Sequence, residues 1–222
     1  MSNELKFKIS HKIIDDNSSN FVIKPLERGY GITVGNSLRR ALLTAVPGAA
    51  ITNVKIEGAL HEFSTLGGIK EDVADILMNL KAVRFHLFES VVEPIRLKIK
   101  GKKTFTAANI QAASNDFTIL NPDLYITEVA KDTTLEIELR LGIGKGYKSS
   151  EENKLNNSPV GIIPIDSIFN PVTKVTFNVS SLPGAKEDLE MLSLDVTTDG
   201  SITPIDAVSY CSSVLSEHYN II

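Results

Sequence analysis

The residues of this chain best suited to chemistry are four histidines, one cysteine and two short glycine-rich stretches. His61-Glu62 is followed by Thr65 where a zinc-protease helix needs its second histidine. No histidine stands at metal-ligand spacing from another, which predicts structural or surface roles for all of them. The four are His11, His61, His86 and His218.

The glycine-rich stretches do not match known phosphate-binding loops. Gly29, Gly31 and Gly35 depart from the dinucleotide-binding spacing, and Gly142–Gly146 lacks the earlier glycine and the hydroxyl residue of a P-loop. Both stretches are expected to form tight backbone turns. No serine occupies a nucleophile elbow. The sequence therefore predicts no catalytic site and no cofactor, and an enzyme stays a third hypothesis that would need a buried cleft of titratable groups.

Composition limits the classes of partner and compartment. The 222 residues carry a formal net charge of −4, which argues against general binding to phosphate backbones. The single Cys211 excludes an internal disulfide and fits a reducing, cytoplasmic location. No stretch approaches the roughly 20 apolar residues of a membrane span, and the first residues do not resemble a signal peptide. We expect a soluble protein with no membrane partner.

Alternation of apolar and polar residues predicts several antiparallel strands, each with one face in water. Helical periodicity occurs only in Thr33–Ala45, Ile69–Lys81 and Pro204–Ile222, so the fold class is predicted as α+β. Lys145–Pro159 has no apolar period and is expected to be a surface loop or a disordered arm. The alternating runs are Val54–Ile56, Ile95–Ile99, Leu135–Leu141, Val175–Val179 and Leu192–Val196.

Turn residues indicate a discontinuous domain organisation. Pro47-Gly48 and Asn170-Pro171 could bracket a mainly-β domain, residues 48–170, inserted into a domain formed by residues 1–47 and 171–222. The first and last helices would then belong to one unit. Composition permits this boundary without requiring it.

The predicted helix Thr33–Ala45 has two distinct faces when residues are placed at about 100° intervals. Thr33 is expected to be its N-cap. The back of the helix carries Arg39, Arg40 and Leu43, an apolar residue between two forked donors, which is typical of a second interface. The alternative is a lone exposed leucine beside solvated arginines. The packing stripe comprises Val34, Leu38, Ala41, Leu42 and Ala45.

The last helix has a well-specified start, with Thr203 as N-cap and Pro204 at the first helical position. Cys211 falls on its apolar face and is predicted to pack rather than react. Lys81 ends the middle helix, where the helix dipole alone could favour a cation. The apolar face of the last helix comprises Ala207, Cys211, Val214, Leu215, His218 and Ile222.

Leu26-Glu27-Arg28-Gly29-Tyr30-Gly31-Ile32-Thr33-Val34-Gly35-Asn36-Ser37-Leu38-Arg39-Arg40-Ala41-Leu42-Leu43 resembles the signature of the bacterial RNA polymerase alpha subunit, in its amino-terminal region. The resemblance covers nearly the whole chain in the family's order. It continues at Val46–Gly48, His61–Thr65, Glu71-Asp72, Ile76–Lys81, Gly144–Tyr147, Ile165–Val172 and Thr198–Ile202.

The resemblance implies a non-catalytic assembly subunit, cytoplasmic and nucleoid-associated as part of the polymerase, a nucleotidyltransferase complex. It implies a homodimer that binds the beta and beta-prime catalytic subunits. In this family the first and last helices form much of the dimer contact, which gives the two stripes a partner. By position, Arg40 and Leu43 match residues that hold beta, whereas Lys81, Ile165 and Val172 match residues that hold beta-prime.

One departure bears on DNA binding. Family members usually continue through a linker into a carboxy-terminal domain that contacts upstream DNA, and this chain stops at Ile222. We therefore expect no direct promoter-DNA contact from this region. A second hypothesis is a standalone interaction module whose dimer face serves another complex, and co-purification of the large polymerase subunits would separate the two.

Overall fold

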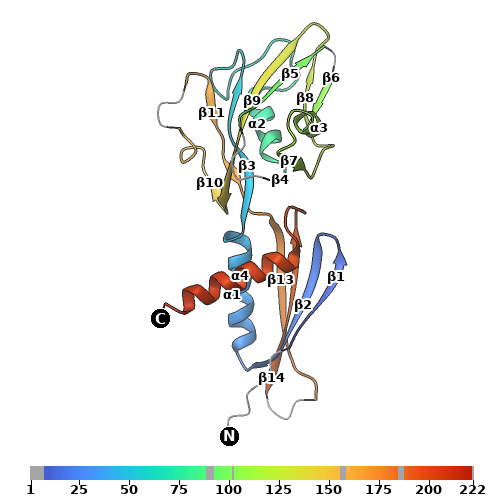
Figure 1. The fold of residues 1–222 in the computed structure, drawn as a ribbon, viewed down its shortest axis with the longest axis vertical. Helices are drawn as coiled ribbons and strands as arrows, with labels where there is room; N and C mark the ends of the chain where they lie inside the picture. Colours follow the sequence, from blue (N-terminus) through green and yellow to red (C-terminus); the bar gives the residue numbers. More distant parts are fainter. Residues whose placement is uncertain (1–7, 89–92, 102, 156–158, 185–187, 222) are drawn as a thin grey trace. The chain divides into compact units, whose positions relative to one another are not determined.

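The computed structural model describes residues 8–88, 93–101, 103–155, 159–184 and 188–221. The chain divides into two compact units (Figure 1). The first unit is formed by the described parts of Met1–Val46 and Asn170–Ile222, and the second unit is Pro47–Phe169. The chain thus leaves the first unit at a proline-glycine pair and returns to it at Asn170.

The first unit is a four-stranded antiparallel sheet with two helices against it (Figure 1). The order across the sheet is β1-β2-β14-β13. The strands are β1 (Lys8–Asp15), β2 (Ser18–Glu27), β13 (Val172–Ser181) and β14 (Leu189–Thr198), and the helices are α1 (Tyr30–Thr44) and α4 (Pro204–Tyr219). Apolar side chains of α1 and α4 fill one core with those of the sheet, including Phe21, Val175 and Leu194.

The two helices of the first unit begin differently. Helix α4 starts as predicted, because the Thr203 side chain accepts a hydrogen bond of 3.1 Å from the Asp206 amide. Helix α1 begins at Tyr30, so the prediction of Thr33 as its N-cap is wrong. The Thr33 hydroxyl instead donates to the Gly29 carbonyl, one turn back.

Gly31 and Gly35 lie inside α1, and the prediction of a tight turn holds only for Gly29, at φ +89°. A Cβ at residue 31 would lie 2.6 Å from Val179 Cγ1, and one at residue 35 would lie 2.6 Å from Phe177 Cδ2. The two glycines therefore allow α1 to approach β13 closely. Close packing of α1 on β13 thus accounts for these two glycines, which match no ligand-binding motif.

The second unit is built on a six-stranded antiparallel sheet in the order β5-β9-β3-β4-β7, with β11 also paired to β3. Two further strand pairs, β6 with β8 and β10 with β12, complete the described strands, with α2 and α3 beside them. The bounds are β3 (Pro47–Ile56), α2 (Val73–Lys81), β4 (Phe85–Leu87), β5 (Ile95–Lys100), β6 (Lys103–Thr106), α3 (Ala107–Gln111), β7 (Phe117–Ile119), β8 (Tyr125–Val129), β9 (Thr134–Lys145), β10 (Tyr147–Lys148), β11 (Ile162–Pro164) and β12 (Ser167–Ile168).

The α+β class is confirmed, and all five alternating runs lie in antiparallel strands. Strand β5 shows strict alternation, with Ile95, Leu97 and Ile99 buried. Helix α2 is four residues shorter than predicted at its start, because Ile69 forms a strand bridge with Val129.

The predicted loop Lys145–Pro159 is wrong at Lys145, which ends β9, and at Tyr147-Lys148, which form β10. The segment that follows is an irregular turn, but it is hydrogen-bonded and buries Asn153 at 5% exposure. Residues 156–158 of that prediction, and Ile222 of the predicted last helix, lie outside the described residues. Gly142 and Gly144 lie within β9 rather than in a turn, where Gly144 makes room for the Phe169 ring.

Candidate functional site

An open apolar groove of about 740 Å³ runs across the first unit between α1, α4 and β1. Val34 and Leu38 line it from α1, and Leu215 lines it from α4. Ile9 of β1 adds a side chain that is 70% exposed. The Ser37 hydroxyl lies 3.3 Å from the Tyr219 hydroxyl and links the two helices beside it. No residue that the structure describes covers this α1–α4 groove, which is a large apolar surface.

The structure divides the predicted dimer residues into surface and core. Leu42, Ala207 and Cys211 have no exposed area, so they support the groove from within and have no surface to offer a second copy. Leu38 and Ala41 keep less than 9% exposure. The residues with accessible side chains are Val34, Ala45, Val214, Leu215 and His218, of which Val34 and Leu215 line the groove.

The other side of α1 presents Arg39 and Arg40, both exposed. Within the described part of the chain, neither guanidinium has an ion-pair partner. Leu43 is half-buried and packs against the core, which corrects the picture of an isolated exposed leucine. The Thr44 hydroxyl donates to the Arg40 carbonyl, a contact that does not involve the Arg40 side chain. This side of α1 therefore presents an exposed guanidinium, that of Arg40, next to the half-buried apolar side chain of Leu43.

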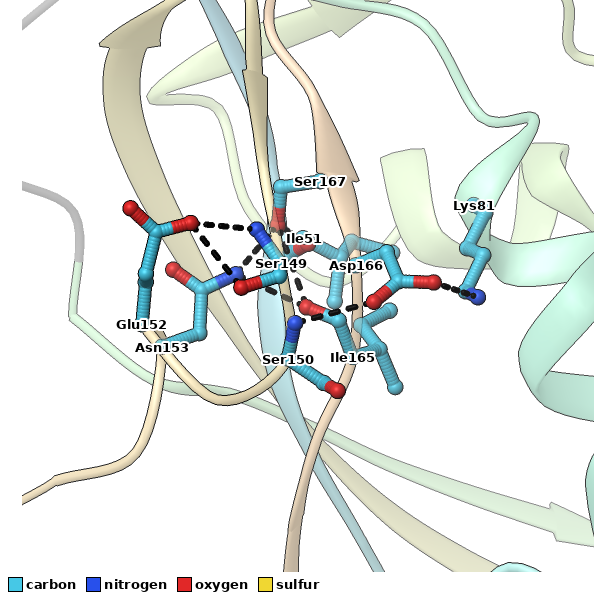
Figure 2. A network of polar contacts seen from close by, with 9 residues as sticks. All are labelled: Ile51, Lys81, Ser149, Ser150, Glu152, Asn153, Ile165, Asp166 and Ser167. Carbon is cyan, nitrogen blue, oxygen red and sulfur yellow. Dashed lines mark hydrogen bonds and ion pairs between the residues drawn. The ribbon is translucent and has the colours of Figure 1, made fainter.

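Lys81, at the end of α2, belongs to a polar network in the second unit (Figure 2). Its ammonium donates to Asp166 Oδ2 at 2.9 Å, and the Ser150 amide donates to Asp166 Oδ1 at 2.9 Å. These hydrogen bonds, that of Lys81 foremost, lower the pKa of the Asp166 carboxyl. About a third of each side chain of the pair is exposed. Lys81 is therefore already neutralised by a partner within the chain.

Asn153 is the buried centre of the same network (Figure 2). Its side-chain amide donates to the Ile165 carbonyl at 2.7 Å and to Ser167 Oγ at 2.9 Å. Ser167 Oγ in turn donates to the Ile51 carbonyl of β3 at 2.7 Å. A buried amide whose donors are satisfied in this way fixes the surrounding backbone. The network thus holds the segment after β10 against β3.

A hollow of about 250 Å³ adjoins Lys81 in the second unit. Phe63 and Met78 stand at it with 79% and 64% exposure, although both are large and apolar. Ile165 also lines it, but only 2% of that residue is exposed. Exposed apolar side chains beside a charged pair are typical of a protein-binding surface rather than a reaction site.

Comparison with known proteins identifies the family. Residues 54–170 match the family model described as the RNA polymerase Rpb3/RpoA insert domain. The chain is 47% identical over 206 residues to the DNA-directed RNA polymerase subunit alpha of Salinibacter ruber, covering 92% of this chain and 63% of that protein. The subunit alpha of Chloroherpeton thalassium is 46% identical over 199 residues, 89% of this chain and 61% of that protein. The chain belongs to the bacterial RNA polymerase alpha-subunit family.

A third alpha subunit, that of Oceanobacillus iheyensis, is 44% identical over 219 residues, which is 97% of this chain and 69% of the relative. The chain spans a little under two thirds of the length of the first two relatives. Membership in the alpha-subunit family therefore rests on both compact units, since these alignments cover most of the chain.

The structure places the three residues matched to beta-prime binding in different settings. Lys81 and Ile165 lie in the second unit, whereas Val172 is the first residue of β13 in the first unit. Val172 is 2% exposed and belongs to the core. Of the three, Lys81 alone offers appreciable surface to a partner. Among the described residues, no group of three or more potential metal ligands occurs, and no helix is long and apolar enough to span a membrane.

Sequence reasoning missed several residues of these surfaces. Ile9, Tyr30 and Tyr219 line the α1–α4 groove and are exposed, but they lie outside the two helical stripes. Alternation within residues 8–15 could have indicated a strand with Ile9 on one face. The carboxylate partner of Lys81 could not be found from spacing, because Asp166 lies 85 residues further along the chain.

Proposed function

We propose that this chain is a non-catalytic assembly subunit of a DNA-directed RNA polymerase, which forms a homodimer and binds the beta and beta-prime catalytic subunits. The observation that carries the proposal is the two-sided α1. Among the described residues, none covers the groove of about 740 Å³ on one side, and the exposed arginine on the other side has no ion-pair partner.

A second copy of the chain is the proposed occupant of the groove. A two-fold dimer would place the same apolar surface on both sides of one interface, so each copy would cover the other's groove. Burial of exposed residues such as Ile9 and Tyr219 would supply the driving force. Val34, Leu215 and the neighbouring Val214 and His218 would contribute from the helices.

The catalytic subunits are proposed to bind outside the groove. Arg40 is proposed to contact beta, together with the neighbouring apolar side chain of Leu43. Lys81 is assigned to beta-prime, together with the exposed Phe63 and Met78 beside it, while Ile165 supports this surface from below. Two identical chains then bind two different partners. Which copy binds beta and which binds beta-prime therefore depends on the whole assembly. This chain itself is proposed to turn over no nucleotide and to contact no promoter DNA directly.

The dimer is tested with matched substitutions on β1. Ile9→Asp places a carboxylate in the proposed interface, whereas Ile14→Asp changes an isoleucine of similar exposure, 60% against 70%, that does not line the groove. Sedimentation equilibrium should give a dimer Kd raised roughly tenfold or more for Ile9→Asp, since burial of one such side chain is worth about 1.5–3 kcal/mol. Equal effects of the two variants would contradict the proposal.

Capture of the catalytic subunits is tested by co-expression of the tagged chain with beta and beta-prime. Wild type is expected to retain both large subunits through an affinity column. A dimer that retains neither subunit would favour the standalone interaction module. Nucleotide turnover by the purified chain would favour the enzyme hypothesis.

A further inference from the structure

Helix α1 begins without a cap of its own. The residue before it, Gly29, has no side chain, and the first turn contains no acidic residue. The first N–H groups of a helix lack partners within the helix and form the positive end of its dipole. A helix that presents surfaces on two sides needs a fixed start, because a change there would move every residue after it.

Glu190 of β14 supplies the missing acceptors from a distant part of the chain. Its Oε1 accepts a hydrogen bond of 2.9 Å from the Gly29 amide, and its Oε2 accepts one of 2.9 Å from the Gly31 amide. Both oxygens of one carboxylate are thus used on the first turn of α1. The contacts join residues about 160 positions apart, and they lie where β14 pairs with the end of β2, with Glu190 opposite Leu26.

The local backbone is shaped to admit this carboxylate. The pairing of β14 with β2 shifts register between Glu190 and Leu192, an irregularity of the kind that re-aims a side chain. A Cβ at residue 31 would lie 2.8 Å from Glu190 Oε2, so a side chain there would displace the carboxylate from its present position. Gly29, at φ +89°, has the conformation that glycine adopts without strain. Residues 29, 31 and 190 therefore fit one another.

We infer that Glu190 is a positioning residue for assembly, which fixes the start of α1 and thereby the placement of the α1–α4 groove. This inference rests on the proposed dimer for its functional readout. The same two backbone hydrogen bonds, from Gly29 and then Gly31, lower the pKa of the Glu190 carboxyl, in agreement with an ionised acceptor at the helix start. The neighbouring Arg28–Asp188 ion pair is highly exposed and contacts neither glycine amide.

The experiment compares variants of the whole 222-residue chain by sedimentation equilibrium and amide hydrogen exchange. Glu190→Ala should raise the dimer Kd about tenfold and speed exchange of the Gly29 and Gly31 amides. Glu190→Gln keeps the shape and one acceptor oxygen, so it should recover part of both losses. Asp188→Asn is the matched surface control and should stay within twofold of wild type. A Kd for Glu190→Ala within twofold of wild type would overturn the inference.

A purely structural role is separated from positioning by a core variant. Val196→Ala removes methyl groups from a β14 residue with 1% exposure and should lower the Tm, while both hydrogen bonds from Glu190 to the start of α1 are kept. If Glu190 positions α1, the dimer Kd of Glu190→Ala should be well above that of Val196→Ala. This should hold even if Val196→Ala has the lower Tm. Equal Kd values at equal Tm would assign Glu190 to stability alone and overturn the inference.

Two further measurements test the Glu190 contact separately from the proposed dimer. Gly31→Ala should lose the Glu190 contact and also crowd Val179 Cγ1, so it should cost at least as much as Glu190→Ala. The loss in the double variant should fall short of the sum of the two single losses, because the Glu190 contact can be lost only once. Additive effects would contradict the inference. If wild type is monomeric at every concentration, the proposed dimer fails, while faster exchange confined to the first turn of α1 in Glu190→Ala would still support the placement of the helix start.

Discussion

The ammonium of Lys81 lies 2.9 Å from Oδ2 of Asp166, and this ion pair joins the last turn of α2 to the segment between β11 and β12. The second carboxylate oxygen of Asp166 accepts from the Ser150 amide, which adds the turn after β10 to the same link. A lysine that resembles a partner-binding residue thus has a structural role within its own chain. The two roles are compatible because about a third of each side chain remains exposed.

Asp166→Asn is expected to destabilise the second unit slightly and to alter its response to acid. The pair is partly solvated, so the loss should be below about 1 kcal/mol. The pKa of Asp166 is lowered in the folded chain, so its contribution is present above the ordinary pKa of an aspartate and is lost as pH falls through the lowered pKa. Urea denaturation between neutral and acidic pH should therefore show a shallower acid-induced loss for Asp166→Asn.

The control for this pH dependence is Glu151→Gln, which removes a carboxylate that pairs with Lys154 on the surface of the same turn. Its acid-induced loss should match that of wild type. An Asp166→Asn variant with an unchanged pH dependence would show that the Lys81 pair contributes nothing to folding stability.

Asn153→Ala should be far more costly than changes at the surface of the same turn. The substitution leaves the Ile165 carbonyl and the Ser167 hydroxyl without their buried donor, which costs about 2–4 kcal/mol. Lys154→Ala alters the adjacent exposed residue and should change the free energy of unfolding by less than about 0.5 kcal/mol. Thermal and urea denaturation measure both. Similar values for the two variants would contradict the central role of Asn153.

Gly35→Ala tests the close approach of α1 to β13. The added methyl would lie 2.6 Å from Phe177 Cδ2, so the helix or the ring must move, at a cost of about 1–3 kcal/mol. Asn36→Ala changes the next residue, which is exposed, and is the control. It should be nearly neutral. In the double variant Gly35→Ala/Phe177→Ala the two losses should not add, because the clash is gone. Strict additivity would exclude the proposed contact.

The sequence predicts those features that local periodicity determines. The alternating runs and the cap of α4 depend on neighbouring residues, and they appear where expected. The start of α1 could not be predicted, because its cap is Glu190, about 160 residues away. Asn153 falls in a predicted loop because periodicity depends on apolar residues and does not detect a buried amide. The helical stripes identified apolar faces, but burial of Leu42 and Cys211 depends on how the sheet covers each helix.

Arg40→Ala is expected to leave the dimer intact and to weaken capture of beta. Arg40 lies away from the α1–α4 groove, and its guanidinium is exposed and available to a carboxylate or carbonyl of a partner. Truncation of one member of a buried, hydrogen-bonded charge contact costs about 2–5 kcal/mol, so retention of beta in a pull-down should fall at least tenfold. Arg39→Ala is the matched control, since it removes an adjacent exposed arginine with the same charge. Equal losses for the two variants would indicate a general electrostatic attraction to beta, and undiminished capture by Arg40→Ala would remove Arg40 from the interface.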